Sequence, residues 1–356
     1  MGKLRMLLAI SVIATHTTPI FGTSLIGGAH AVHAFYIISG FYMSMILNEK
    51  YTGKNSFQMF ITNRFLRLYP VYWVVLFLSV MFSCFVYIHN KGVNNALLTS
   101  YVNYFFILKL PWKLFLIIVN LFVFGQDIVM FMGFNSNTGN LVLTKNFHAS
   151  NPQVYTFLFV PQAWTLALEL TFYLIAPFLL RKSLKFICLL IMVAFSLRLL
   201  SVHYGYDYDP WNNRFFVFEI GFFLAGNIAY RIYCWLRTKD FKRMYYHLTL
   251  VCIGLVIILF YHLPFKTPLL YACIFISIPI LFIGSKGDRW DRVLGELSYP
   301  IYISHFLLLQ LTEYLGLPIS GILLTAESIF FSILLNEFIS KKIEIIRQKR
   351  LRGYAV

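Results

Sequence analysis

Charged residues are scarce in this sequence, and acidic residues are the scarcest among them. Only 12% of the 356 residues are Asp, Glu, Lys or Arg, whereas 59% are hydrophobic and 19% are aromatic. A typical soluble domain has about 25% charged residues, so this composition excludes a soluble globular protein. It indicates a polytopic membrane protein.

Cysteine is also rare, and its five positions have no paired spacing. This pattern predicts neither a disulfide framework nor a zinc site, and we expect no metal cofactor. Nothing in the sequence indicates an internal repeat, a signal peptide or a second soluble domain. The cysteines lie singly in apolar segments, at Cys84, Cys188, Cys234, Cys252 and Cys273.

Positive charge exceeds negative charge, with 30 Lys and Arg against 14 Asp and Glu. Such an excess can indicate nucleic-acid binding, but here the basic residues form short clusters between apolar runs. That distribution is typical of the cytoplasmic loops of membrane proteins. We therefore expect no nucleic-acid partner.

Eleven apolar segments have roughly the 20 residues that a helix needs to cross a bilayer. From the fifth segment onward, basic loops alternate with weakly charged loops, as expected for successive crossings. The segments are residues 3–21, 31–48, 68–89, 112–133, 162–180, 185–203, 213–235, 246–263, 268–284, 297–315 and 318–340.

The charge pattern favours about ten full crossings with both termini in the cytoplasm. This arrangement requires residues 90–160 to stay on the outer side, with 112–133 in the interface or dipping into the membrane. An alternative with twelve crossings, in which 94–110 and 112–133 both span the bilayer, also satisfies the charges. In either case we predict an all-α integral membrane protein.

The first apolar segment contains two ionisable residues that would share one helix face. Arg5 and His16 are eleven residues apart, which places them about 16 Å apart along a helix axis with a net rotation of roughly 20°. Polar side chains within a membrane span are costly and usually functional. In a group-transfer reaction, His16 would act as a general base on the hydroxyl that accepts the group, or as a nucleophile that carries the group itself. The sequence does not separate these two routes. A neutral histidine that bridges helices is the alternative.

Two further arginines would converge with Arg5 at the cytoplasmic face. Arg64 and Arg67 are three residues apart and therefore lie on one side of the helix that leads into the third span. Guanidinium groups bind phosphates bidentately and stay charged, so these three residues suit a phosphorylated donor such as acyl-coenzyme A. Ordinary anchoring of membrane helices is the alternative.

Glu169 lies about a third of the way into the segment 162–180, where a carboxylate needs a partner. It would orient or charge-balance His16, or contact the incoming hydroxyl. The alternative is a structural ion pair with Arg198 or Arg214. Candidates for substrate binding are Ser39, Trp164, Tyr173 and His305, although a packing role for His305 fits equally well.

Five motifs follow one another along the chain. They are Arg5 with His16, residues 35–41, Arg64 with Arg67 and the stretch 68–73 behind them, residues 164–173, and residues 298–305. In this order they resemble the membrane acyltransferase family 3, and the resemblance covers most of the chain. Thr165 stands where the family usually has serine, and Ala31 and His33 also depart from its pattern.

The resemblance implies a membrane-embedded O-acyltransferase. Its donor would be a cytoplasmic acyl-coenzyme A, commonly acetyl-coenzyme A, with no permanently bound cofactor. Its acceptor would be a hydroxyl of an O-antigen, an exopolysaccharide or another lipid-linked glycan at the bacterial inner membrane, with glycan-assembly proteins as partners. Arg5, Arg64 and Arg67 would hold the donor phosphates, His16 would be the base or acyl relay, and Glu169 would support His16 or the acceptor.

We expect an acyltransferase domain over residues 1–341 and a basic cytoplasmic tail over 342–356. Some relatives carry a fused esterase-like domain, and we expect none here. The competing function is a transporter that exports an anionic or acylated glycan, in which the intramembrane charges would line a path.

Overall fold

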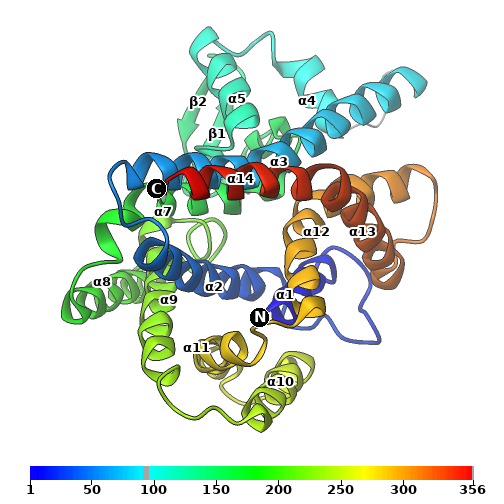
Figure 1. Ribbon diagram of the computed structural model, residues 1–356. Helices are drawn as coiled ribbons and strands as arrows, with labels where there is room; N and C mark the ends of the chain where they lie inside the picture. Colours follow the sequence, from blue (N-terminus) through cyan, green and yellow to red (C-terminus); the bar gives the residue numbers. More distant parts are fainter. Residues whose placement is uncertain (91–95, 355–356) are drawn as a thin grey trace.

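Helices make up most of the chain in the computed structural model, which describes residues 1–90 and 96–354 (Figure 1). A two-stranded antiparallel hairpin, β1 (Met132–Asn135) with β2 (Asn140–Leu143), is an addition that the all-α prediction did not include. The α-helices are α1 (Gly2–Ile13), α2 (Gly28–Glu49), α3 (Ser56–His89), α4 (Ala96–Tyr104), α5 (Leu110–Phe122), α6 (Gln126–Val129), α7 (Trp164–Leu179), α8 (Leu184–His203), α9 (Phe216–Leu236), α10 (Arg243–Ile258), α11 (Lys266–Gly284), α12 (Arg289–Tyr314), α13 (Gly321–Leu335) and α14 (Lys341–Tyr354). Short 3₁₀ turns are η1 (Phe147–Ala149), η2 (Val154–Phe157), η3 (Pro161–Ala163) and η4 (Phe260–His262), and η5 (Asn336–Ser340) is a π turn.

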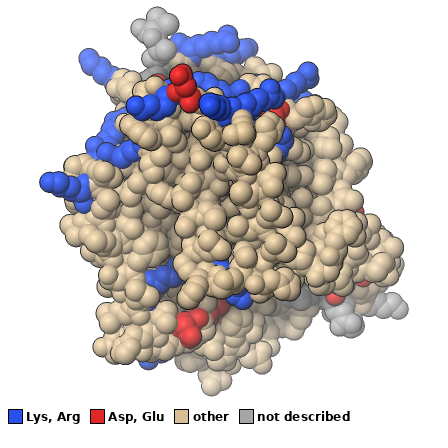
Figure 2. All heavy atoms as spheres, turned by 90° about the horizontal axis from the view of Figure 1, so that it is seen from below, with Lys and Arg blue, Asp and Glu red and all other residues tan. Residues whose placement is uncertain are grey.

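Six helices in the described part of the chain are long and apolar enough to cross a membrane. Figure 2 shows Lys and Arg gathered along one edge of the molecule, next to a broad surface that carries almost no charge. Such an uncharged belt is the surface that lipid requires. The protein is therefore a multi-pass membrane protein, whereas ten crossings and cytoplasmic termini stay predictions. The six helices are Gly28–Glu49, Ser56–His89, Pro161–Leu179, Leu184–His203, Lys266–Gly284 and Gly321–Arg352.

The predicted span 3–21 is wrong at its end, because α1 stops at Ile13. With 12 residues, α1 is about 18 Å long and shorter than the hydrocarbon core of a bilayer. Pro19 cannot continue a helix, and the residue before a proline avoids the helical conformation. The hydroxyl of Thr15 donates to a carbonyl four residues earlier, 3.1 Å away. His16 therefore lies in a loop beyond the helix.

The predicted segment 112–133 is also not one helix. α5 ends at Phe122, and Gly125 with a φ of +88° begins the short α6. With 13 residues α5 is about 20 Å long, and α4 has only 9 residues, so each is shorter than a bilayer core. Neither α4 nor α5 is among the helices in the described part of the chain that are long and apolar enough to cross a membrane. Residues 91–95 of the predicted outer segment lie outside the described residues.

Aromatic side chains of α3 fix this helix to the end of α5. The hydroxyls of Tyr69 and Tyr72 donate to backbone carbonyls of α5, and the Trp73 Nε1 donates to the carbonyl of Leu121 at 2.8 Å. The last carbonyls of a helix have no partner within the helix, so these donors complete α5. The aromatic residues of the stretch 68–73 therefore have a structural role, which is to hold α3 against α5.

Two glycines bring the backbones of α2 and α9 into direct contact. A Cβ atom added to Gly40 would lie 1.8 Å from the carbonyl oxygen of Phe223, and one added to Gly226 would lie 2.1 Å from the carbonyl oxygen of Ile37. Small residues at such crossings allow membrane helices to approach closely. The contact holds α2 in place and so positions Ser39, one residue before Gly40.

The C-terminal residues form a helix that packs on the rest of the molecule. α14 follows α13 through the π turn η5 and lies along α3 (Figure 1). The Arg350 Nη2 donates to the Thr62 hydroxyl of α3 at 2.8 Å. Most of the predicted tail is thus ordered against α3, and residues 355–356 lie outside the described residues.

Candidate functional site

A cavity of about 710 Å³ lies among α1, α2, α3, α7, α12 and α14. It follows α12 from Asp291 to Tyr302, eleven residues or about 16 Å of helix. Its volume is in the range of sites for small molecules and cofactors. The cavity therefore offers an elongated ligand a path along α12.

The three predicted arginines all line this cavity. Arg5 comes from α1, and Arg64 and Arg67 come from α3. Arg67 interacts electrostatically with both of the other two, so the three cations are close together. The Arg64 side chain is buried, and its Nε has no hydrogen-bond partner among the described residues. The sequence prediction that these residues converge is confirmed, and the arrangement leaves guanidinium donors free for an anion.

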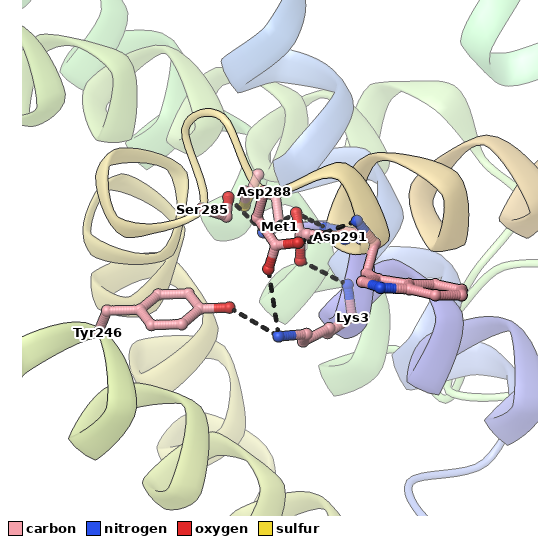
Figure 3. Close-up of polar contacts among 8 residues, drawn as sticks. Met1, Lys3, Tyr246, Ser285, Asp288 and Asp291 are labelled. Atoms are coloured by element: carbon pink, nitrogen blue, oxygen red, sulfur yellow. Dashed lines mark hydrogen bonds and ion pairs between the residues drawn. The ribbon is translucent and has the colours of Figure 1, made fainter. Parts of the chain in front are cut away.

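A polar cluster fixes the start of α1 and thereby the position of Arg5 (Figure 3). Asp291 of α12 accepts hydrogen bonds from the backbone amides of Gly2 at 2.7 Å and Lys3 at 3.0 Å, and its partner at 2.9 Å is the Met1 ammonium. Burial opposes ionisation of this carboxyl, but the two amides and the ammonium hold the pKa of Asp291 below its usual value.

Close packing next to this cluster also depends on small residues. A Cβ atom added to Gly2 would lie 1.6 Å from the carbonyl oxygen of Asp291, and one on Gly295 would lie 3.6 Å from Arg5 Nη1. α1 and α12 therefore meet closely at the end of the cavity where Arg5 lies.

Glu169, Ser39 and Tyr173 meet in the cavity wall. The Ser39 and Tyr173 hydroxyls each donate to Glu169 Oε1 at 2.5 Å. Charge-assisted hydrogen bonds of this kind hold a carboxylate firmly in one orientation. The structure thus brings together three residues that the sequence nominated separately.

Neither predicted ion-pair partner of Glu169 contacts it. Arg198 pairs with Glu219 at 3.0 Å, and Arg214 pairs with Asp209 at 2.5 Å. The described residues also show no hydrogen bond between Glu169 and His16. Glu169 therefore belongs to the wall of the cavity with its two hydroxyl donors.

His16 does not share a helix with Arg5, contrary to the sequence prediction, because α1 ends three residues before it. Its side chain is exposed and is not part of the cavity wall. Arg5 lies near the start of α1, and His16 lies beyond its other end. Facial alignment was the part of the prediction that failed.

His16 lies against His305 of α12, with ring centroids 5.4 Å apart and planes tilted by 32°. His305 is fully buried, and its Nδ1 lies 2.6 Å from the carbonyl oxygen of Tyr302. A carbonyl only accepts, so this Nδ1 carries the proton and Nε2 carries the lone pair. Nε2 has no hydrogen-bond partner in the described part of the chain. The pair thus combines an exposed imidazole with a buried one whose Nε2 can accept a hydrogen bond.

Tyr302 separates the cavity from this histidine pair. It lines the cavity, and its ring lies 5.8 Å from that of His305. The Thr165 hydroxyl lies 2.8 Å from the Tyr302 hydroxyl, which also donates to the carbonyl oxygen of Gln162 at 3.0 Å. Thr165 therefore supplies the hydroxyl that a serine would supply. Sequence reasoning did not assign Tyr302, although its position within the motif 298–305 was a signal.

Tyr36 is a second cavity residue that sequence reasoning missed. It is buried on α2, one turn before Ser39, and its hydroxyl has no hydrogen-bond partner among the described residues. An unpaired buried hydroxyl is costly, so this group suits a ligand acceptor in the cavity. The available signal was its place next to Phe35 in the motif 35–41.

Trp164, nominated for substrate binding, is not part of the cavity wall. Its ring is buried, and the Arg214 guanidinium lies 4.2 Å from the ring centroid. A cation–π contact therefore occupies one face of the indole. Within residues 1–90 and 96–354, no group of three or more His, Cys, Asp or Glu is placed to hold a metal ion.

Comparison with known proteins gives one match. The acyltransferase domain of the acyltransferase 3 family matches residues 4–336, which contain all the nominated site residues. Neither a curated protein nor a solved structure matches the chain. Because the match covers nearly the whole sequence, the chain belongs to the acyltransferase 3 family of membrane acyltransferases.

Proposed function

We propose that this protein moves an acyl group from cytoplasmic acyl-coenzyme A to a hydroxyl of a cell-surface carbohydrate, with acetyl as the first candidate for the group. The observation that supports this function best is that one cavity joins three arginines to Glu169 and Tyr302. Arginines suit the donor phosphates, and about 16 Å of path suits an extended arm that ends in a thioester.

The orientation of this path follows from charge. The basic edge in Figure 2 would face the cytoplasm by the positive-inside rule, and we propose that a cytoplasmic donor reaches the cavity arginines from that side. His16 would then lie on the opposite side, where a lipid-linked O-antigen or exopolysaccharide precursor is accessible. The proposed location is the bacterial inner membrane, with glycan-assembly proteins as the suppliers of acceptor.

In the proposed reaction, His16 takes the proton from an acceptor hydroxyl as the oxygen attacks the acyl carbonyl. The new C–O bond forms, the C–S bond breaks, and the leaving thiolate recovers a proton. The free Tyr36 hydroxyl would donate to the oxygen that gains charge, as oxyanion-hole donors do. We favour the base role for His16 over direct attack on the thioester because His16 does not line the cavity.

The direct test is turnover of radiolabelled acetyl-coenzyme A by the purified protein in nanodiscs, with bacterial membrane glycan as acceptor. We expect donor binding and transfer of label into the glycan fraction. Movement of glycan across the bilayer without label transfer would support the transporter instead. A protein that binds no acyl-coenzyme A would contradict the proposed donor.

Removing an arginine should weaken donor binding more than it slows chemistry. For Arg67→Ala we expect an increase in the apparent KM for acetyl-coenzyme A of about 10-fold, the effect of one charge-assisted hydrogen bond, with kcat almost unchanged. Arg67 is exposed, so its loss leaves no buried group unpaired, and Arg64→Ala should give a larger effect because Arg64 is buried. Steady-state kinetics measures both, and an unchanged KM in both variants would remove these arginines from the donor site.

A further inference from the structure

The cavity is closed on one side by α14, which the sequence assigned to a tail outside the acyltransferase domain. Ile343, Glu344, Arg347 and Gln348 of this helix all line the cavity. α14 also lies beyond residues 4–336, the part of the chain that matches the family. The C-terminal helix therefore adds a wall to the cavity from outside the matched region.

The π turn η5 sets the direction of α14. Its end residues Asn336 and Ser340 line the same cavity. π turns are rare, and they occur frequently at functional sites because the extra residue re-aims the side chains that follow. In Figure 1 the chain changes direction between α13 and α14, which lays α14 along α3, the helix that carries Arg64 and Arg67.

Arg347 is the residue of α14 whose environment calls for a ligand. Only 6% of it is exposed, and its Nη1 donates to Glu344 of the same helix. Its Nε has no hydrogen-bond partner in the part of the chain that the structure describes, and the same holds for Arg64. Two buried guanidinium groups with unfilled donors are costly unless an acceptor fills the space between the helices.

The charge balance of the cavity also indicates an anionic ligand. Seven Lys and Arg line the cavity against four Asp and Glu, which leaves an excess of three positive charges. Arg64 and Arg67 both interact electrostatically with Arg347, so like charges face one another across α3 and α14. A ligand with several negative charges would balance this excess, whereas a ligand with one carboxylate would leave two positive charges uncompensated.

We infer that Arg347 is a fourth phosphate-binding residue of the donor site, and that α14 makes the enzyme select a donor with nucleotide phosphates. This inference rests on the proposed function, because it concerns the same donor cavity. Coenzyme A carries a diphosphate and a further ribose phosphate, which is more phosphate than two adjacent arginines of α3 can bind bidentately. Arg347 approaches such a ligand from the opposite wall.

The test compares two donors, acetyl-coenzyme A and S-acetylpantetheine, which carries the same thioester without any phosphate. We expect Arg347→Gln to reduce kcat/KM for acetyl-coenzyme A about 10- to 100-fold and to leave kcat/KM for S-acetylpantetheine within about twofold. Lys349→Ala is the matched control. It removes the same charge from α14, but Lys349 is exposed and lies outside the cavity wall. It should leave both values unchanged.

The outcomes separate the two proposals. If the wild type uses both donors equally, the donor site does not select for phosphate and the inference about α14 is wrong. If the wild type uses neither donor, the proposed acyl-coenzyme A donor is wrong. If the wild type prefers acetyl-coenzyme A and Arg347→Gln keeps that preference, Arg347 does not bind phosphate. A variant that loses activity with both donors equally has lost the packing of α14, and that result would assign Arg347 a structural role and overturn the inference.

Discussion

Replacing His16 with alanine is expected to reduce acyl transfer by about 100- to 10,000-fold, the usual contribution of a general base. Binding of acyl-coenzyme A should stay unchanged. His16 is exposed in the loop after α1 and lies outside the wall of the donor cavity, so its loss removes the ring contact with His305 but no donor contact. Transfer of label and equilibrium donor binding, measured on the same nanodisc sample, check both parts.

His203→Ala is the matched control, since His203 is an exposed histidine at the end of α8, away from the cavity. It should retain full activity. A His16→Ala protein that transfers label at the wild-type rate would refute the base role. A wild-type protein that acquires covalent label from the donor before any acceptor is added would instead support the acyl-imidazole route.

The three arginines could be predicted from sequence because they depend on local spacing. Arg64 and Arg67 are one helical turn apart, and a helix of any tertiary context would place them on one side. The basic character of that end of the molecule was equally accessible, because lipid excludes charge from the spans. The spacing of Arg64 and Arg67 and the basic character of that end together predicted that the arginines of α1 and α3 would converge.

The error at His16 came from weighing apolar length above helix stop signals. Residues 3–21 are apolar enough for a span, but Thr15 and Pro19 end the helix early. The contact between His16 and His305 joins residues almost 300 positions apart. No local pattern carries such a pairing, because it depends on how the loop after α1 folds over α12.

Tyr36, Tyr302 and α14 were missed for a related reason. Their roles depend on which polar atoms are left without partners once the helices pack, and that is a property of the assembled cavity. In sequence, Tyr36 is one of 23 tyrosines and Arg347 belongs to a run of basic residues that resembles an ordinary cytoplasmic tail.

Gly226→Ala is expected to lower the free energy of unfolding by about 3 kcal/mol, at the upper end of the cost of overpacking. The new Cβ would lie 2.1 Å from the carbonyl oxygen of Ile37, and a backbone carbonyl cannot rotate away as a side chain can. α2 and α9 must separate to accept it. Thermal unfolding in detergent should show a clear decrease in Tm and in the yield of folded protein.

Gly254→Ala on α10 is the control that isolates the crossing from helix propensity. A Cβ at Gly254 would meet nothing within 4 Å, so this variant should be as stable as the wild type or slightly more stable, because alanine favours helix over glycine. Equal Tm values for the two variants would show that α2 and α9 tolerate separation. A loss confined to Gly226→Ala would show instead that stability depends on the direct contact of the two helix backbones, the same contact that holds α2 and its Ser39 beside Glu169.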